Sequence, residues 1–304
     1  IWNADLNSLS NWTSTSFLPS NMYPDKGVGL GRYKDLIVAF GRESTEFYRN
    51  VGNSGGSPLQ RVNEAFFKIG CLGPTTICQL EDNVAWVGSS DIGSISVYML
   101  DGYKPVRIST TTVDTQLALR GTATIYMTSA KLFGKTFIFV QAGTTTFVYC
   151  VEDHMWHEWI SDHIRWHKLA ANTAATPTIY GISRVLTTGK VYRINPVVPV
   201  YTDDTNAYVL RIQTSKFDLQ KERRKRCSKL VVIGDTYSSS NAVNISWSDD
   251  DYQTFSTPRQ VNMNARAQLT NCGMFRQRAF LLTNETSSPL RLERLELEIS
   301  EGLH

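Results

Sequence analysis

Short apolar runs and segments of alternating apolar and polar residues dominate the chain, and Gly, Asp, Asn and Ser separate most of them. Alternation and runs of this length are typical of β-strands, and the separating residue types favour tight turns. We therefore expect hairpin-connected antiparallel sheet, with strands at residues 36–40, 75–80, 84–88, 94–100, 106–110, 122–127, 136–140 and 145–150.

Helix content is expected to be low, because no stretch combines a helical period of apolar residues with capping residues. The best helical candidate, residues 217–226, is polar on all sides. The sequence therefore predicts an all-β protein.

The strands come in groups that recur at the spacing of about 40 to 50 residues expected of propeller blades. Residues 70–110 form the clearest group, with four strands joined by turns. Residues 122–159 repeat this plan, residues 166–194 form a looser copy, and residues 27–49 supply part of another blade. The predicted fold class is all-β, with β-propeller blades of antiparallel strands.

The pattern changes after residue 200, where longer strands alternate apolar and polar residues. We predict propeller blades in residues 1–200 and a carboxy-terminal β-rich segment in residues 201–304, which forms either further blades or a β-sandwich. The chain begins with Ile1 rather than Met, and we expect upstream sequence to complete the ring of blades.

The net charge of the chain does not indicate a strongly charged partner. The chain has 31 basic and 28 acidic residues, and a net charge of +3 is too small a field to indicate nucleic-acid or membrane binding by the whole chain. No apolar run approaches the ~20 residues that a transmembrane helix needs. We therefore expect protein partners and no membrane-spanning segment.

The cysteines are five in number, an odd count, and none are spaced closely enough for a zinc or redox motif. We expect buried free thiols, without metal or cofactor, at Cys71, Cys78, Cys150, Cys227 and Cys272.

One segment matches the nucleophile motif G-x-S-x-G, with Ser54 at its centre. A trypsin-like serine needs a histidine base earlier in the chain, yet the first histidine is His154. The other hydrolase arrangement needs a helix directly after the motif, where Pro58 stands instead. We interpret the segment as a turn and assign no catalytic residue. The glycine-rich residues 27–31 likewise precede a strand rather than the helix of a dinucleotide site.

Histidine and tryptophan gather in one region of the chain, residues 154–167. Strand geometry sends His154 and His157 to opposite faces, which favours a packed aromatic edge over a metal site. We predict exposed aromatic rings that form a protein interface at Trp156, Trp159 and Trp166.

A dense basic run lies at residues 221–226. Such a run is either a solvated loop or strand edge, or a surface that faces phosphates. The residues of this possible DNA-channel or interface run are Lys221, Arg223, Arg224, Lys225 and Arg226.

Residues 248–255 resemble an Asp-box, the hairpin turn S-x-D-x-G-x-T-W/F. In this turn the serine hydroxyl and the aspartate carboxylate accept backbone N–H groups while the aromatic residue packs beneath. Tyr252 stands where glycine is usual, and a calcium loop is the alternative, although the Gly and distal Glu of an EF-hand are absent. The predicted structural turn residues are Ser248, Asp250, Thr254 and Phe255.

Several ordered motifs together resemble the packaged-DNA-stabilisation proteins of short-tailed bacteriophages, also described as tail accessory factors or tail nozzle proteins. The resemblance spans nearly the whole chain. It is carried by YPD at 23–25, GLGRYKDLIVAFG at 29–41, STEFY at 44–48, GC at 70–71, DNVAWVG at 82–88, PVRIST at 105–110, FVY at 147–149, WHEW at 156–159 and WSDDD at 247–251.

This resemblance implies a structural virion protein rather than an enzyme. It implies a ring of copies, expected to be a hexamer, below the portal and its adaptor, which retains packaged DNA and forms the ejection channel. The implied partners are portal-adaptor proteins, tail fibre, spike or needle proteins, and double-stranded DNA that passes through the lumen without sequence specificity. The implied location is the virion tail, after assembly in the host cytoplasm.

The alternative is an Asp-box β-propeller that binds or hydrolyses glycans, as sialidases do. Such an enzyme needs an arginine cluster for a substrate carboxylate and a pair of catalytic carboxylates at the ring centre. No acid pair is identifiable in the sequence, so the structural role is favoured.

Overall fold

The computed structural model describes the chain apart from residues 6, 7, 9, 20–22, 54, 55, 90–92, 121–124, 172–177, 185–188, 195–200, 221, 237–240 and 302–304, and only the backbone of His167. The chain forms two compact units, Ile1–Pro196 and Val197–His304. Each unit has cores of its own.

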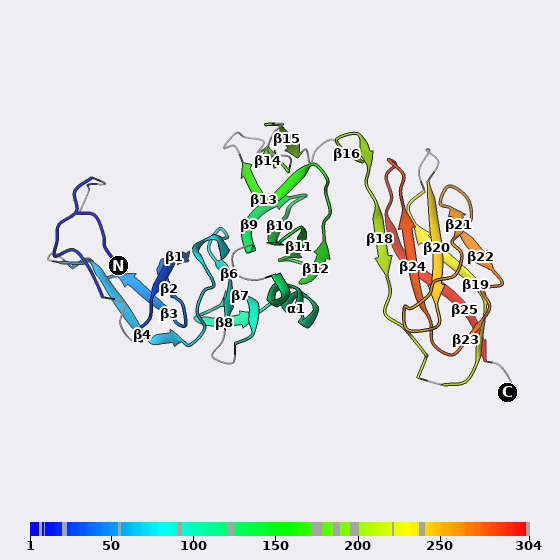
Figure 1. Ribbon diagram of the computed structural model, residues 1–304, viewed down its shortest axis with the longest axis horizontal. Helices are drawn as coiled ribbons and strands as arrows, with labels where there is room; N and C mark the ends of the chain where they lie inside the picture. The colour runs from blue at the N-terminus through cyan, green and yellow to red at the C-terminus, as the bar shows by residue number, and fades with distance from the viewer. Residues whose placement is uncertain are drawn as a thin grey trace. The chain divides into compact units, whose positions relative to one another are not determined.

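The described residues of unit 1 form four antiparallel sheets, within each of which neighbours in sequence are neighbours in space (Figure 1). The first three have four strands and the fourth has three. In chain order they are β1 (Gly27–Tyr33), β2 (Leu36–Gly41), β3 (Thr45–Asn50) and β4 (Leu59–Phe67); β5 (Ile77–Gln79), β6 (Val84–Ser89), β7 (Ile95–Asp101) and β8 (Lys104–Arg107); β9 (Ile125–Leu132), β10 (Lys135–Ala142), β11 (Thr145–Cys150) and β12 (Met155–Glu158); then β13 (Ile164–Ala171), β14 (Ile179–Ser183) and β15 (Val191–Ile194).

These sheets confirm the predicted all-β fold with blades of antiparallel strands. Local turn chemistry sets their register. Between β9 and β10, for example, Phe133 and Gly134 both have positive φ, +54° and +75°. Two such residues form the type I′ turn whose twist matches that of a hairpin.

Consecutive sheets of unit 1 bury their faces against one another. Between the first and second sheets, the rings of Phe40 and Trp86 have centroids 5.0 Å apart, and Trp86 is fully buried. Between the third and fourth, Phe139 stacks on Trp166 at 5.7 Å. Each core therefore lies between two neighbouring sheets, as in stacked propeller blades.

Two glycines allow the main chain to pass closely where the first two sheets meet. A Cβ atom on Gly70 would lie 1.9 Å from the carbonyl oxygen of Arg42, and one on Gly88 would lie 2.3 Å from the carbonyl oxygen of Gly70. Because both contacts are with backbone atoms, no side chain fits at Gly70 or Gly88, which explains why glycine occupies these positions.

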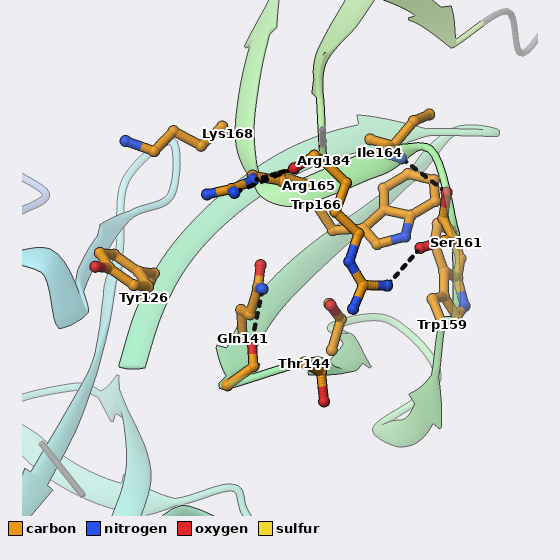
Figure 2. A pocket seen from close by; sticks show the side chains of 12 residues that line it. Tyr126, Gln141, Thr144, Trp159, Ser161, Ile164, Arg165, Trp166, Lys168 and Arg184 are labelled. Atoms are coloured by element: carbon orange, nitrogen blue, oxygen red, sulfur yellow. Dashed lines mark hydrogen bonds between the residues drawn. The ribbon is translucent and has the colours of Figure 1, made fainter. Parts of the chain in front are cut away.

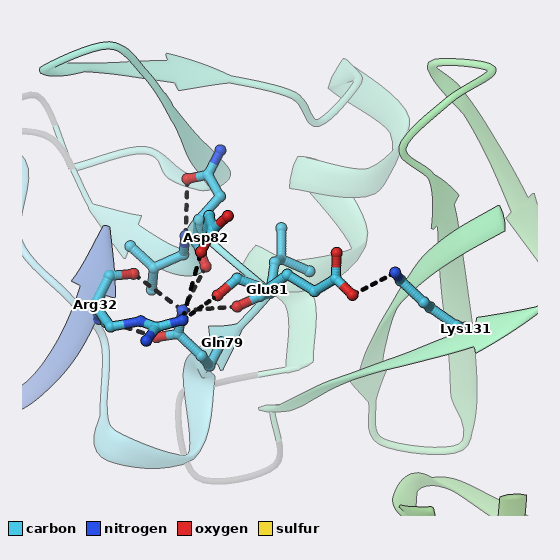
Figure 3. A network of polar contacts seen from close by, with 8 residues as sticks. Arg32, Gln79, Glu81, Asp82 and Lys131 are labelled. Carbon is cyan, nitrogen blue, oxygen red and sulfur yellow. Dashed lines mark hydrogen bonds and ion pairs between the residues drawn. The ribbon is translucent and has the colours of Figure 1, made fainter. Parts of the chain in front are cut away.

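An exposed polar network also connects the first three sheets (Figure 3). The Gln79 side chain accepts the Arg32 amide at 2.9 Å and donates to the Arg32 carbonyl at 3.0 Å. The carbonyl oxygen of Gln79 accepts the Ser129 hydroxyl at 2.9 Å, and Glu81 pairs with Lys131. Gln79 thus bonds to β1 on one side and β9 on the other.

The described residues also include one α-helix that the sequence pattern did not predict, α1 (Thr111–Arg120), besides the 3₁₀ turn η1 (Pro74–Thr76). The hydroxyl of Thr110 accepts the amide of Val113 at 3.4 Å, in the position of an N-cap. Only Val113 and Leu117 of this helix are buried. Two apolar residues on one face are too few to produce a visible helical period. Within the candidate 217–226, Phe217 forms a β-bridge and Lys225 begins a strand.

Unit 2 is a β-sandwich, preceded by the short pair β16 (Thr202–Asp203) and β17 (Asn206–Ala207). One sheet has the order β18 (Leu210–Gln213), β24 (Ala279–Asn284), β20 (Ala242–Ser248), β21 (Arg259–Asn262). In the other, β19 (Lys225–Gly234) pairs with β22 (Gln268–Thr270), β23 (Met274–Phe275) and β25 (Leu292–Glu301). Leu230 of one sheet and Ile245 and Phe280 of the other share one core. Of the two forms that the sequence left open for this segment, the structure shows the sandwich.

Among the described helices, none has the length and apolarity needed to cross a membrane.

Candidate functional site

The Asp-box-like turn after β20 is closed by hydrogen bonds from its serine and aspartate. The Ser248 hydroxyl donates to Asp250 Oδ1 at 2.8 Å and accepts the Tyr252 amide at 3.0 Å. The carboxylate of Asp250 accepts the amide of Thr254 at 2.9 Å and also the Thr254 hydroxyl. The Thr254 hydroxyl, the Thr254 amide and the Ser248 hydroxyl lower the pKa of Asp250 to about 2. Phe255 is half-buried.

Tyr252 adopts the left-handed conformation, φ +66°, that glycine usually takes in this turn. Its hydroxyl accepts the amide of Lys216 at 2.9 Å and donates to the carbonyl of Thr214 at 3.3 Å. These bonds tie the turn to the segment after β18, and they offset the conformational cost of a tyrosine at positive φ.

Beside the turn lies a buried arginine that the sequence analysis did not single out. Arg278 is 1% exposed, and its Nε and Nη2 donate to the two carboxylate oxygens of Asp249 at 2.7 and 2.8 Å. Its guanidinium also lies 4.4 Å from the ring centroid of Phe275 and 5.1 Å from that of Trp247. This bidentate, ring-flanked ion pair has a structural role, because it holds the turn to the sandwich.

The three consecutive aspartates therefore have three separate partners. Asp249 pairs with Arg278, Asp250 with Ser248 and Thr254, and Asp251 with Lys216 at 2.6 Å. In the part of the chain that the structure describes, no three His, Cys, Asp or Glu side chains are placed to hold a metal ion. The geometry gives the calcium-loop alternative no support.

The basic run does not form one continuous cationic surface. Lys225 is fully buried, and its ammonium donates to the carbonyl oxygens of Arg223 at 3.0 Å and Arg276 at 2.7 Å. Its inclusion among exposed DNA-facing residues is therefore wrong, because alternation along β19 turns this side chain inward. Arg223, Arg224 and Arg226 are exposed, and Lys221 lies outside the described residues.

The three predicted interface tryptophans mostly pack within unit 1. Trp166 is 6% exposed, and Trp159 meets it edge to face at 5.1 Å. Trp156 is half-buried and donates from Nε1 to the carbonyl of Ile108 at 2.8 Å. The expectation of an exposed ring is thus wrong for Trp166, because the third and fourth sheets enclose it.

The remaining sequence candidates do not form a site. Ser54 lies outside the described residues, so its predicted turn stays a prediction.

His154 lies in a turn with its Nδ1 3.1 Å from the Tyr149 hydroxyl, whereas His157 is exposed on β12. All five cysteines are buried and free, and burial raises the pKa of Cys78 to about 11.

A pocket of about 360 Å³ lies between the third and fourth sheets of unit 1 (Figure 2). Its lining combines three cationic side chains with aromatic rings, hydroxyls and an amide, and it includes no carboxylate. The lining residues are Tyr126, Gln141, Gly143, Thr144, Thr146, Trp159, Ser161, Ile164, Arg165, Trp166, Lys168 and Arg184.

The two arginines of the pocket are oriented by main-chain carbonyl groups. Arg165 donates from Nε and Nη2 to the carbonyl oxygen of Arg184 at 3.3 and 3.1 Å. Arg184 donates from Nη1 to the carbonyl oxygen of Ser161 at 3.2 Å. Figure 2 shows Arg165 and Lys168 on the side of Tyr126, and the Arg184 guanidinium nearer Trp159. Carbonyl groups therefore fix both guanidinium groups without neutralising them.

A strand irregularity places several of these residues. Along β13, the pairing with β14 shifts register between Arg165 and Leu169, so Trp166 and Lys168 fall within a bulge. Bulges redirect side chains and are frequent beside functional sites. The indole Nε1 of Trp166 is buried there without a hydrogen-bond partner. The sequence showed the tryptophans but not the pocket, because a bulge leaves no signature in an apolar pattern.

The stacked antiparallel sheets of unit 1 have the architecture of β-propeller blades, and unit 2 is a β-sandwich. A family model described as bacteriophage P22 Gp10, β-propeller, matches residues 1–185. The chain belongs to this family of phage stabilisation proteins, which are virion components.

No curated protein matches the chain. Among solved structures, the chain is similar to an exo-β-1,3-galactanase from Phanerochaete chrysosporium, solved with β-1,3-galactotriose. That similarity has 8% sequence identity and a TM-score of 0.23, and it covers 90% of this chain and 68% of the galactanase chain.

Proposed function

We propose that this protein is a non-enzymatic part of the short tail, in the nozzle or hub below the portal and its adaptor. There, a ring of copies, proposed to be a hexamer, retains packaged DNA and forms the ejection channel. The family match over residues 1–185 is the observation that carries this proposal.

The architecture agrees with a structural role. Sheets that pack face to face through aromatic cores, as Phe40 and Trp86 do, make a rigid body suited to repeated contacts in a closed ring. We also propose that portal-adaptor and fibre, spike or needle proteins bind this body, which assembles in the host cytoplasm.

We propose that the exposed cations of the basic run, rather than the whole run, contact DNA. Arg223, Arg224 and Arg226 are exposed and can meet phosphates without sequence specificity. Lys225 cannot, since carbonyl groups surround its ammonium.

The glycan-hydrolase alternative gains no support from the geometry. The Asp-box-like turn of this chain lies in the sandwich of unit 2 rather than in a blade. The described residues that line the basic pocket of unit 1 include no carboxylate. Glycoside hydrolysis requires two carboxyl groups that flank the scissile bond.

Genome retention tests the proposal. Phage with an early stop codon in the gene for this protein should fill heads with DNA and then lose it, as measured by nuclease-sensitive DNA over several hours. Supplying the full-length protein from a plasmid should restore both retention and tail completion. Heads that hold their genome equally well without the protein, or saturable glycan hydrolysis by the pure protein, would contradict the proposal.

A further inference from the structure

The pocket between the third and fourth sheets contains more donors than its own acceptors satisfy. Its three cations, Arg165, Lys168 and Arg184, form no ion pair among the described residues. The buried indole N–H of Trp166 adds a donor without a partner. A buried donor left unsatisfied is costly, so a ligand that accepts hydrogen bonds here gains affinity.

The free atoms of Arg184 indicate the shape of that ligand. This guanidinium donates from Nη1 to the Ser161 carbonyl oxygen, and its Nε and Nη2 lie together on another edge. That edge is the fork which binds the two oxygens of a carboxylate or phosphate side by side. The neighbouring hydroxyls of Thr144 and Thr146 can satisfy the remaining oxygen lone pairs.

We propose that this pocket is an oxyanion site that takes a carboxylate carried by a protein segment, either an acidic side chain or a chain terminus. The pocket favours such a segment over duplex DNA because Trp166, at 6% exposure, is recessed and both arginines are half-buried between sheets, so that of the three cations only Lys168 is exposed. A phosphate on a stiff duplex meets exposed cations more readily than recessed ones. The site goes beyond the proposed tail role and does not depend on it.

Calorimetric titration of the full chain measures the binding. The probe is a short capped peptide with a central Glu, and the comparison peptide has Gln at that place. We expect binding of the Glu peptide with negligible binding of the Gln peptide. Arg184→Lys keeps the charge but removes the fork, and it should weaken binding roughly tenfold. The matched control is Arg266→Gln beside Arg184→Gln, because Arg266 is exposed and lies in unit 2.

The indole N–H resonance of Trp166 gives a second measurement that does not depend on affinity. It is assigned by its loss in Trp166→Phe, and it should move downfield when the Glu peptide binds but not with the Gln peptide. Equal affinity for the two peptides, or no effect of Arg184→Gln, would overturn the proposal. Binding of inorganic phosphate alone, or of a 20-base-pair duplex alone with loss in Arg184→Gln, would overturn it in favour of a free anion or nucleic acid.

Discussion

The side-chain amide of Gln79 pairs with both main-chain polar groups of Arg32, accepting its N–H at 2.9 Å and donating to its carbonyl at 3.0 Å. A side chain of the second sheet thereby continues the hydrogen bonding of an edge strand, β1, of the first sheet. It covers part of an edge that would otherwise be open to pairing with other chains.

This pairing predicts that Gln79→Glu destabilises the protein by about 1 to 3 kcal/mol, because a carboxylate accepts the Arg32 amide but cannot donate to the carbonyl oxygens of Arg32, Leu80 and Asn83. Urea unfolding measures the change. Gln60→Glu is the control, since Gln60 is exposed on β4 and undergoes the same change of charge. Equal stability of the two variants would contradict the prediction.

The close passage at Gly70 makes a second prediction. Gly70→Ala should destabilise by about 2 to 4 kcal/mol, because the new Cβ would lie 1.9 Å from the Arg42 carbonyl oxygen and the backbone must move. Gly27→Ala, where the Cβ meets nothing within 4 Å, should change stability by less than about 1 kcal/mol. Thermal unfolding compares the two, and a tolerated Gly70→Ala would show that the sheets do not pack as described.

The buried ion pair between Arg278 and Asp249 in unit 2 leads to a third prediction. Asp249→Asn leaves the guanidinium of Arg278 buried without its anion and should cost about 2 to 4 kcal/mol. The control is Asp251→Asn, because Asp251 and Lys216 form an exposed pair worth less than about 1 kcal/mol. Urea unfolding of both variants should separate them, whereas similar losses would mean that the Arg278 pair contributes no more than a surface pair.

Asp250 predicts a specific dependence on pH. Its pKa in the folded protein, about 2, lies below its ordinary value of 3.8, so the ionised carboxylate stabilises the fold above that ordinary value. This contribution is lost as the pH falls from about 4 towards 2. Between those pH values the wild type should therefore lose more stability than Asp250→Asn. Parallel slopes for the two proteins would contradict the prediction, and a melting temperature lowered by chelator would favour a calcium loop instead.

Lys225 separates structure from DNA contact within the basic run. Lys225→Met leaves the carbonyls of Arg223 and Arg276 without a donor and should destabilise by about 1 to 3 kcal/mol. Arg224→Met removes an exposed charge and should leave stability within about 0.5 kcal/mol. The affinity for DNA, measured at several salt concentrations, should show the opposite order, with Arg224→Met weakening binding more than Lys225→Met. A Lys225→Met protein that is fully stable would contradict this division.

The strands could be predicted from the sequence because their signals are local. The apolar run within residues 145–150 is a signal of a few residues, and β11 has the same bounds as the predicted strand. Grouping by blades followed from spacing. The helix α1 could not be predicted, because only Val113 and Leu117 mark its buried face.

The side-chain environments were less predictable because they depend on contacts far apart in sequence. Trp166 is buried by Phe139 of another sheet, and Arg278 meets Asp249 across 29 residues. The pocket depends on a bulge and on the folding of Arg184 back towards Ser161. None of these contacts has a signature in composition or spacing.

Electron cryo-microscopy of the native virion is the measurement that locates this protein in the particle. We expect density for the stacked sheets of residues 27–194 in the short tail below the portal, repeated around the tail axis in a closed ring. Tail density that is complete without this chain, or the chain located elsewhere in the particle, would contradict it.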